Sequence, residues 1–90
     1  MKEKIIFVQQ LLKTKGYPIG NVDGVLGTKT LSALDQINPQ YASWKGTRKL
    51  VAFIQSLCKQ KAIEVGEIDG LWGTQTSFAY SILKYEQLHE

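Results

Sequence analysis

The chain has 90 residues, 43% of them hydrophobic, and a formal net charge of +3 at pH 7. A chain of this length supports one modest core, and we expect residues 1–90 to form a single domain. The longest apolar run near the start spans only residues 5–8, which is too short for a signal-peptide core or a membrane span. The positive charge favours anionic partners such as nucleic acid, acidic membranes or phosphate-bearing polymers, but does not choose among them.

The first predicted element is an amphipathic helix over residues 3–15. Its apolar residues recur at steps of three and four, the spacing of one helical face: Ile5, Val8, Leu11 and Leu12. Gly16 follows, and a glycine there suits the left-handed backbone position that closes a helix.

A glycine-rich turn, VDGVLGTKT, occupies residues 22–30 and is called the first elbow below. The Asp23 side chain can accept a hydrogen bond from the backbone amide two residues on, and Gly24 offers a positive φ. Gly27 or Thr28 can cap the next helix by satisfying its first free amides. The sequence IDGLWGTQT at residues 68–76 repeats this pattern and is called the second elbow.

Three further helices are predicted. The second covers residues 28–37, and the proline in NPQ at 38–40 ends it because proline disfavours helical geometry in the preceding residue. After a joint at 39–45, the third helix covers about 46–62 and the fourth about 74–87. Their apolar faces carry, in chain order, Leu31, Leu34 and Ile37; Leu50, Ile54, Leu57 and Cys58; and Phe78, Ala79, Ile82 and Leu83.

The chain contains an internal duplication. Adding 46 to a position in the first half gives its counterpart, and 12 of the 31 pairs between residues 7 and 37 are identical without a gap. Repeat units of about 3–38 and 46–87 follow from this alignment. We therefore predict an all-α fold, a small bundle of about four helices built from two helix–turn–helix repeats with a pseudo-twofold relation.

The elbow motif has a structural explanation at each repeated position. Aspartate fixes the turn, the glycines permit it, and the apolar residues on either side point inward, Val22 and Leu26 in one unit and Ile68 and Trp72 in the other. We assign structural roles to Asp23, Gly24, Gly27, Thr30, Asp69, Gly70, Gly73 and Thr76.

Other readings of the elbows fail on spacing. A calcium loop with its glycine sixth would place Ile19 first and Thr30 twelfth, where carboxylates are needed. A phosphate-binding loop needs Gly-Lys-Ser/Thr at the helix start, which is absent.

Composition also argues against catalysis. Glycan hydrolysis needs two carboxylates facing each other across a cleft, and the turns already use Asp23 and Asp69. Zinc hydrolases need several ligands at set spacing, whereas Cys58 is the only cysteine and His89 the only histidine, one residue from the C-terminus. We expect Cys58 to be a small core side chain, and we expect no enzyme activity, metal or cofactor.

The stretch FVQQLLKTKGYPIGNVDGVLGTKTLSAL at residues 7–34 resembles the peptidoglycan-binding domain family. The matching positions are Gln9, Leu12, Gly16, Tyr17, Asp23, Gly24, Gly27, Thr30 and Ala33 in the first unit and Gln55, Asp69, Gly70, Gly73, Thr76 and Ala79 in the second. The second unit has Ala62-Ile63 in place of Gly-Tyr. Family members commonly form a three-helix bundle, whereas here a break at Pro39 and a spacer containing Trp44 separate two full units.

The resemblance implies a non-catalytic module that anchors a cell-wall hydrolase, such as a bacteriophage endolysin, on bacterial peptidoglycan. The implied partners are peptidoglycan and a fused or associated hydrolase. The resemblance also fits a protein made in the cytoplasm without a signal peptide that acts at the bacterial cell wall.

Sugar rings and peptide stems need aromatic faces together with amide, hydroxyl and cationic donors in a shallow groove. We expect such a groove beside each elbow, formed by Tyr17, Asn21, Thr28 and Lys29 in the first unit and by Glu67, Trp72, Thr74 and Gln75 in the second. Trp72 has an alternative role as a core plug, because Leu26 fills the equivalent place. Tyr41 and Trp44 in the joint either cap the core or form an exposed platform.

Two other functions remain open. The same fold could dock a partner protein. A less favoured reading is DNA binding, because Lys45, Arg48 and Lys49 begin the third helix, and helix starts can lie against phosphates. No helix, however, carries the run of Arg, Asn and Gln on one face that base reading requires.

Overall fold

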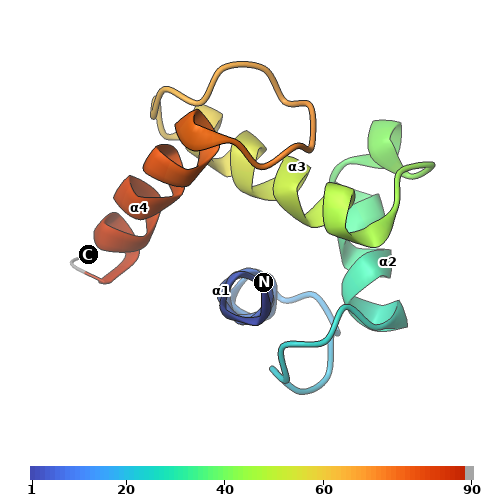
Figure 1. Ribbon diagram of the computed structural model, residues 1–90. Helices are drawn as coiled ribbons and strands as arrows, with labels where there is room; N and C mark the ends of the chain where they lie inside the picture. The colour runs from blue at the N-terminus through green and yellow to red at the C-terminus, as the bar shows by residue number, and fades with distance from the viewer. Residues whose placement is uncertain (89–90) are drawn as a thin grey trace.

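The computed structural model describes residues 1–88, and its four helices lie where the sequence predicted them (Figure 1). The bounds are α1 Lys2–Thr14, α2 Thr28–Ile37, α3 Gly46–Gln60 and α4 Thr74–Leu88. Residues 1–88 contain no strand, so the all-α prediction is confirmed. The helix ends differ from the prediction by at most two residues. His89 lies outside the described residues.

Helix α3 is the centre of the bundle and packs against α1, α2 and α4. In Figure 1 it lies across the view between α4 and α2, whereas α1 is seen along its own axis, so α1 runs crosswise to α3. Four α3 side chains are completely buried: Leu50, Ala52, Ile54 and Cys58. The prediction that Cys58 is a core side chain is confirmed, and its burial raises the pKa of the thiol.

The core follows the sequence repeat. Positions related by the offset of 46 are buried in both units, among them Val8 and Ile54, Leu12 and Cys58, Ile19 and Val65, and Ala33 and Ala79. Because equivalent side chains from both units belong to one hydrophobic cluster, neither unit has a core of its own.

The two units close their first helices in the same way with different residues. Gly16 has φ of +91°, and the backbone N–H of Tyr17 donates to the carbonyl of Leu12 at 3.0 Å. The equivalent Ala62 has φ of +61°, and the N–H of Ile63 donates to the carbonyl of Cys58 at 2.8 Å. A residue with a Cβ pays about 1–2 kcal/mol for this left-handed conformation, so the second unit carries strain that the first avoids.

The joint between the units packs against the second elbow through a stack of aromatic side chains and an arginine. It contains a short 3₁₀ helix, η1 Pro39–Tyr41. The rings of Tyr41 and Trp44 stack with centroids 4.3 Å apart, and the Arg48 guanidinium lies 3.7 Å from the Trp44 ring. The Arg48 Nε donates to the carbonyl of Asp69 at 2.9 Å. Trp44 is therefore tied to the second elbow through Arg48.

One predicted core residue is wrong. Phe78 was expected on the apolar face of the fourth helix, but its side chain is 69% exposed. Its counterpart in the first unit, Ser32, is also exposed, so this position of the repeat faces solvent in both units. The true inward face of α4 contains Thr76, Ala79, Tyr80 and Leu83. Among residues 1–88, no helix has the length and apolar character needed to cross a membrane.

Candidate functional site

A buried glutamine holds the first elbow in place. The Oε1 atom of Gln9 accepts backbone N–H groups from Asp23 at 3.1 Å and Gly24 at 2.9 Å. Its Nε2 atom lies within hydrogen-bond distance of three acceptors: the Asp23 Oδ1 at 3.1 Å, the Val25 carbonyl at 3.0 Å and the Thr30 hydroxyl at 3.1 Å. An amide has two N–H bonds, so these acceptors share them. Gln9 is only 1% exposed and links α1, the elbow and α2.

The second elbow repeats four of these five contacts around Gln55. Its Oε1 accepts the N–H of Gly70 at 2.9 Å, and its Nε2 faces the Asp69 Oδ1 at 3.1 Å, the Leu71 carbonyl at 3.2 Å and the Thr76 hydroxyl at 3.0 Å. In both units the aspartate and the second threonine of the elbow motif therefore belong to a glutamine-centred network. The identical pair Gln9/Gln55 was visible in the sequence, but its role was missed. A polar residue repeated on the core-facing side of both helices was the available signal.

The elbow aspartates act as predicted. Asp23 and Asp69 each accept the backbone N–H two residues on, from Val25 at 3.0 Å and from Leu71 at 2.9 Å. These amide hydrogen bonds, followed by those from the glutamine side chains, lower the pKa of both carboxyl groups from the ordinary value of 3.8. Both carboxylates are thus held ionised as acceptors within the turn.

A side chain at either elbow glycine would clash, but with different neighbours. Gly24 and Gly70 have φ of +76° and +71°, as predicted. A Cβ on Gly24 would meet the flexible Lys2 side chain at 2.6 Å. A Cβ on Gly70 would meet the Arg48 side chain and carbonyl oxygen and, at 2.9 Å, the Trp44 ring. The second elbow is therefore packed more closely against its neighbours than the first.

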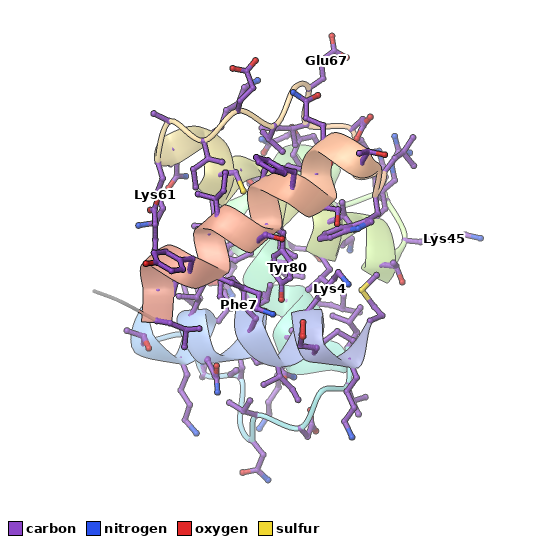
Figure 2. The ribbon with its side chains drawn as sticks, turned by 60° about the vertical axis from the view of Figure 1, so that its left-hand side comes forward. Lys4, Phe7, Lys45, Lys61, Glu67 and Tyr80 are labelled. Carbon is purple, nitrogen blue, oxygen red and sulfur yellow. The ribbon has the colours of Figure 1, made fainter. Side chains whose placement is uncertain are left out.

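A shallow cleft lies beside each elbow, and the two clefts are built from equivalent positions. The first elbow cleft has a volume of about 350 Å³ and the second about 280 Å³. Seven of the eight predicted contact residues line them: Asn21, Thr28 and Lys29 the first, and Glu67, Trp72, Thr74 and Gln75 the second. Each cleft therefore brings amide, hydroxyl and charged groups together over the glutamine network. The first offers an ammonium group and the second a carboxylate (Glu67 is labelled in Figure 2).

Tyr17, the eighth predicted contact, does not line the first elbow cleft. It is half-buried and packs against the hydrophobic core. The Trp72 side chain contacts both the second cleft and the core. It lines the second cleft but is also half-buried against the core, with its ring edge-to-face with Tyr80 at a centroid distance of 5.4 Å. The core-plug role considered for Trp72 is thus observed, and only part of its surface faces the cleft.

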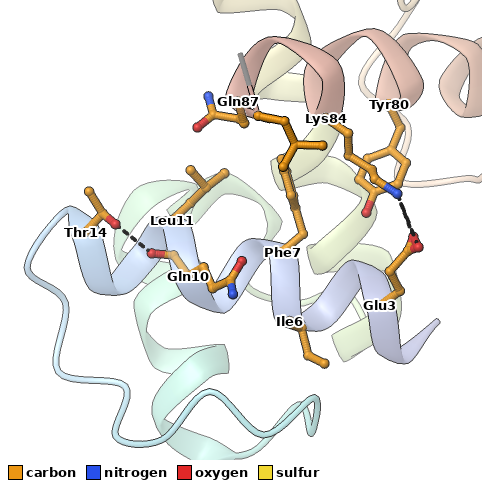
Figure 3. A pocket seen from close by; sticks show the side chains of 10 residues that line it. Glu3, Ile6, Phe7, Gln10, Leu11, Thr14, Tyr80, Lys84 and Gln87 are labelled. Atoms are coloured by element: carbon orange, nitrogen blue, oxygen red, sulfur yellow. Dashed lines mark hydrogen bonds and ion pairs between the residues drawn. The ribbon is translucent and has the colours of Figure 1, made fainter. Parts of the chain in front are cut away.

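A further concavity, the α1–α4 groove, was not predicted (Figure 3). It has a volume of about 370 Å³. Its lining is formed by Glu3, Ile6, Phe7, Gln10, Leu11 and Thr14 of α1 and Tyr80, Lys84, Gln87 and Leu88 of α4. The groove exists because α1 runs crosswise beside α4, an arrangement that no local pattern in the sequence reports.

An ion pair and a buried tyrosine mark the α1–α4 groove. The Lys84 Nζ lies 3.0 Å and 3.2 Å from the two carboxylate oxygens of Glu3, and this contact lowers the pKa of the Glu3 carboxyl group. Tyr80 is only 5% exposed, and burial, helped by the negative charge of Glu3, raises the pKa of its hydroxyl to about 12. The hydroxyl therefore remains a protonated hydrogen-bond donor at neutral pH.

Within residues 1–88, no group of three or more His, Cys, Asp or Glu side chains is placed to hold a metal ion. The carboxylates of Asp23 and Asp69 are engaged with turn amides, and that of Glu3 with Lys84. The arrangement is suited to binding through hydrogen bonds and apolar contact. Comparison with protein-family models, with curated proteins and with solved structures found no match to this chain.

Proposed function

We propose that this chain is a non-catalytic peptidoglycan-binding module that anchors a fused or associated cell-wall hydrolase, such as a bacteriophage endolysin, on its substrate. The observation that carries the proposal is the pair of elbow clefts at equivalent positions of the repeat. A polymer with repeating units can occupy two such clefts at once, which raises the overall affinity above that of either cleft alone.

The lining of the clefts agrees with such a ligand. Wall glycans and their stem peptides present hydroxyl, amide, carbonyl and carboxylate groups, and the clefts offer matching donors and acceptors. Lys29 can meet a carboxylate, whereas Thr28, Thr74 and Gln75 can bond hydroxyl and amide groups. All four side chains are exposed. They are therefore free to bind without disturbing the core.

Co-sedimentation with purified peptidoglycan sacculi tests the proposal. The informative variants are Lys29→Ala, Gln75→Ala and the double variant, since these exposed side chains lie at equivalent positions of the two clefts. We expect each single change to weaken binding about 3–10-fold, the value of one or two hydrogen bonds, and the double change to weaken it much further.

Lys15→Ala is the matched control, because it removes one exposed positive charge outside both clefts. Loss of binding in this control as well would indicate general charge attraction. Wild-type protein that does not sediment with sacculi would reject the function. Wild-type-like binding by the double variant would reject the elbow clefts as the site.

The DNA-binding alternative loses most of the cationic groups on which it was based. Arg48 is stacked on Trp44 and bonded to the second elbow, and Lys49 forms an ion pair with Asp35 at 2.8 Å. Lys45 alone of the three projects outward (Figure 2). Parallel binding to DNA-cellulose at two salt concentrations tests this alternative, since phosphate contacts weaken steeply with salt.

The protein-docking alternative has one observation in its favour. Helix α4 exposes Phe78 at 69% and Tyr85, which is seven residues on and on the same side of the helix, at 64%, whereas α2 has Ser32 in place of Phe78. A partner that uses this face would be weakened by Phe78→Ser, whereas binding to sacculi through the elbow clefts would not change.

A further inference from the structure

The two repeat units differ at the contact between the first helix of one unit and the second helix of the other. At the α2–α3 contact, three core positions hold Leu26, Leu34 and Leu50. At the α1–α4 contact, the equivalent positions hold Trp72, Tyr80 and Lys4. A set of three aliphatic side chains has thus been replaced by two aromatic rings and an ammonium group.

These three residues form one cluster at the edge of the α1–α4 groove. The Lys4 Nζ lies 4.6 Å from the Trp72 ring centroid and 5.7 Å from that of Tyr80, and the two rings meet edge-to-face. Figure 2 shows Lys4 and Phe7 on α1 beneath Tyr80, which points from α4 toward them. A second hollow of about 430 Å³ adjoins the groove, shares Tyr80 and Lys84 with it, and is lined by Lys4 and Trp72.

The walls of the groove are apolar and partly exposed. Phe7 and Leu11 are half-buried, whereas their equivalents on α3, Phe53 and Leu57, are 2% and 7% exposed. Helix α1 therefore presents to the groove an apolar surface that α3 hides in the core. A small apolar group seated there would remove this surface from water, which favours its binding.

The Tyr80 hydroxyl is a buried polar group of the groove. Among the described residues it has no hydrogen-bond partner. A buried donor without a partner is costly, and a ligand that supplies an acceptor would recover that cost. The surrounding charges favour an anionic acceptor, since Lys4 and Lys84 carry two positive charges and Glu3 carries one negative charge.

We propose that the α1–α4 groove is a separate binding site for a short peptide that ends in a free carboxylate next to an apolar side chain. The carboxylate accepts a hydrogen bond from the Tyr80 hydroxyl and lies near Lys4 and Lys84. The apolar side chain of the peptide packs against Phe7 and Leu11. The volume of about 370 Å³ is sufficient for one or two residues. This proposal goes beyond the proposed function and does not depend on the elbow clefts.

The test is an NMR titration of the whole ¹⁵N-labelled chain with N-acetyl-alanyl-leucine, and with its C-terminal amide as the matched probe. We expect the free acid to shift the amide signals of Phe7, Tyr80 and Lys84. The amide should bind about tenfold more weakly, the value of one charge-assisted hydrogen bond. Equal affinity of the acid and the amide, or no shift in the groove at about 10 mM peptide, would overturn the proposal.

Two variants locate the effect. Tyr80→Phe removes only the unpartnered hydroxyl and keeps the ring, so it should fold normally. It should weaken binding of the acid about tenfold and binding of the amide less, because the amide oxygen accepts only a neutral hydrogen bond. Lys4→Leu installs the residue found at the equivalent position 50 and should weaken binding of the acid about fivefold. Wild-type affinity in Tyr80→Phe would contradict the assigned contact.

The double variant Lys29→Ala/Gln75→Ala separates this site from the elbow clefts. It should lose binding to sacculi yet titrate with the peptide like the wild type. Loss of both activities would mean that the peptide binds in the elbow clefts, which contradicts the assignment to the groove. A chain that binds the peptide but not sacculi would reject the proposed function and retain the groove.

Discussion

The first and second units agree closely at their elbows and differ around them. Gln9 and Gln55 make matching hydrogen bonds to the same elements of their elbows, at distances between 2.9 and 3.2 Å. By contrast, the helix-closing residue is Gly16 in one unit and Ala62 in the other. The elbow is covered by Lys2 in the first unit and by Arg48 and Trp44 in the second.

This difference separates the residues that make the fold from those that are free to change. A buried amide network tolerates little variation, because any lost partner leaves a desolvated polar group. Substitutions at the helix ends, in the side chains packed over the elbows and in the contacts between the units cost less stability, and these positions have diverged. In this duplicated chain, identity at buried positions therefore indicates a structural role.

The largest expected effect comes from removing either central glutamine. Gln9→Met and Gln55→Met keep the side-chain length but leave several buried polar groups without partners. We expect each to lower the free energy of unfolding by about 3 kcal/mol or more, measured by urea denaturation. Gln10→Met, at an exposed position of the same helix, is the control. A loss below about 1 kcal/mol in one unit would break the equivalence of the elbows.

Substituting alanine for the elbow glycines should destabilise the two elbows by different amounts, because different groups pack against them. Both substitutions force a side chain into a positive φ, which costs about 1–2 kcal/mol. In Gly24→Ala the obstacle is the flexible Lys2 side chain, whereas in Gly70→Ala it includes the backbone carbonyl of Arg48. We expect thermal or urea unfolding to show a further loss of about 1 kcal/mol for Gly70→Ala. Equal losses would mean that the joint does not hold the second elbow.

Exchanging the residues that close the first helix of each unit should change stability by smaller amounts and in opposite directions. Ala62→Gly removes the left-handed strain but adds freedom to the unfolded chain, so we expect a gain of about 0.5–1 kcal/mol. Gly16→Ala should lose about as much, since open space surrounds its missing Cβ and only the φ is unfavourable. Differential scanning calorimetry of both variants checks the prediction. A destabilised Ala62→Gly would show that the methyl group of Ala62 has a packing role.

Acid should weaken both elbows to a similar, small extent. The folded-state pKa of Asp23 and of Asp69 lies below 3.8, so their ionised contacts stabilise the protein above about pH 4. That contribution is lost as the pH falls through the lowered folded-state pKa. The variant Asp23→Asn/Asp69→Asn should therefore show a flatter decline of melting temperature between about pH 4 and pH 2 than the wild type. Identical slopes would contradict the assigned hydrogen bonds.

Local sequence patterns predicted much of the fold. Helical spacing of apolar residues placed all four helices, and the Asp-Gly pair predicted both the turn and its positive φ. The offset of 46 showed which residues are equivalent, and their matching burial follows from it. These features depend on interactions between residues close in the chain, which is why they can be read from the sequence.

The parts that were missed depend on contacts between distant segments. Phe78 has an apolar side chain but sits on the outward face of α4, and Tyr17 packs on the core instead of lining its cleft. The joint folds back over the second elbow through Trp44 and Arg48. The α1–α4 groove depends on the crossing of two helices that are far apart in sequence. No periodicity or motif encodes these arrangements directly.

Amide hydrogen exchange at Gly24 and Gly70 tests the central claim most directly. Both residues lie in turns, where exchange is ordinarily fast, but their N–H groups donate at 2.9 Å to buried glutamine oxygens. We predict protection approaching that of the core of α3 at both positions, and loss of protection at Gly70 alone in the Gln55→Met variant. Rapid exchange at both glycines in the wild type would contradict the account of how the elbows are held.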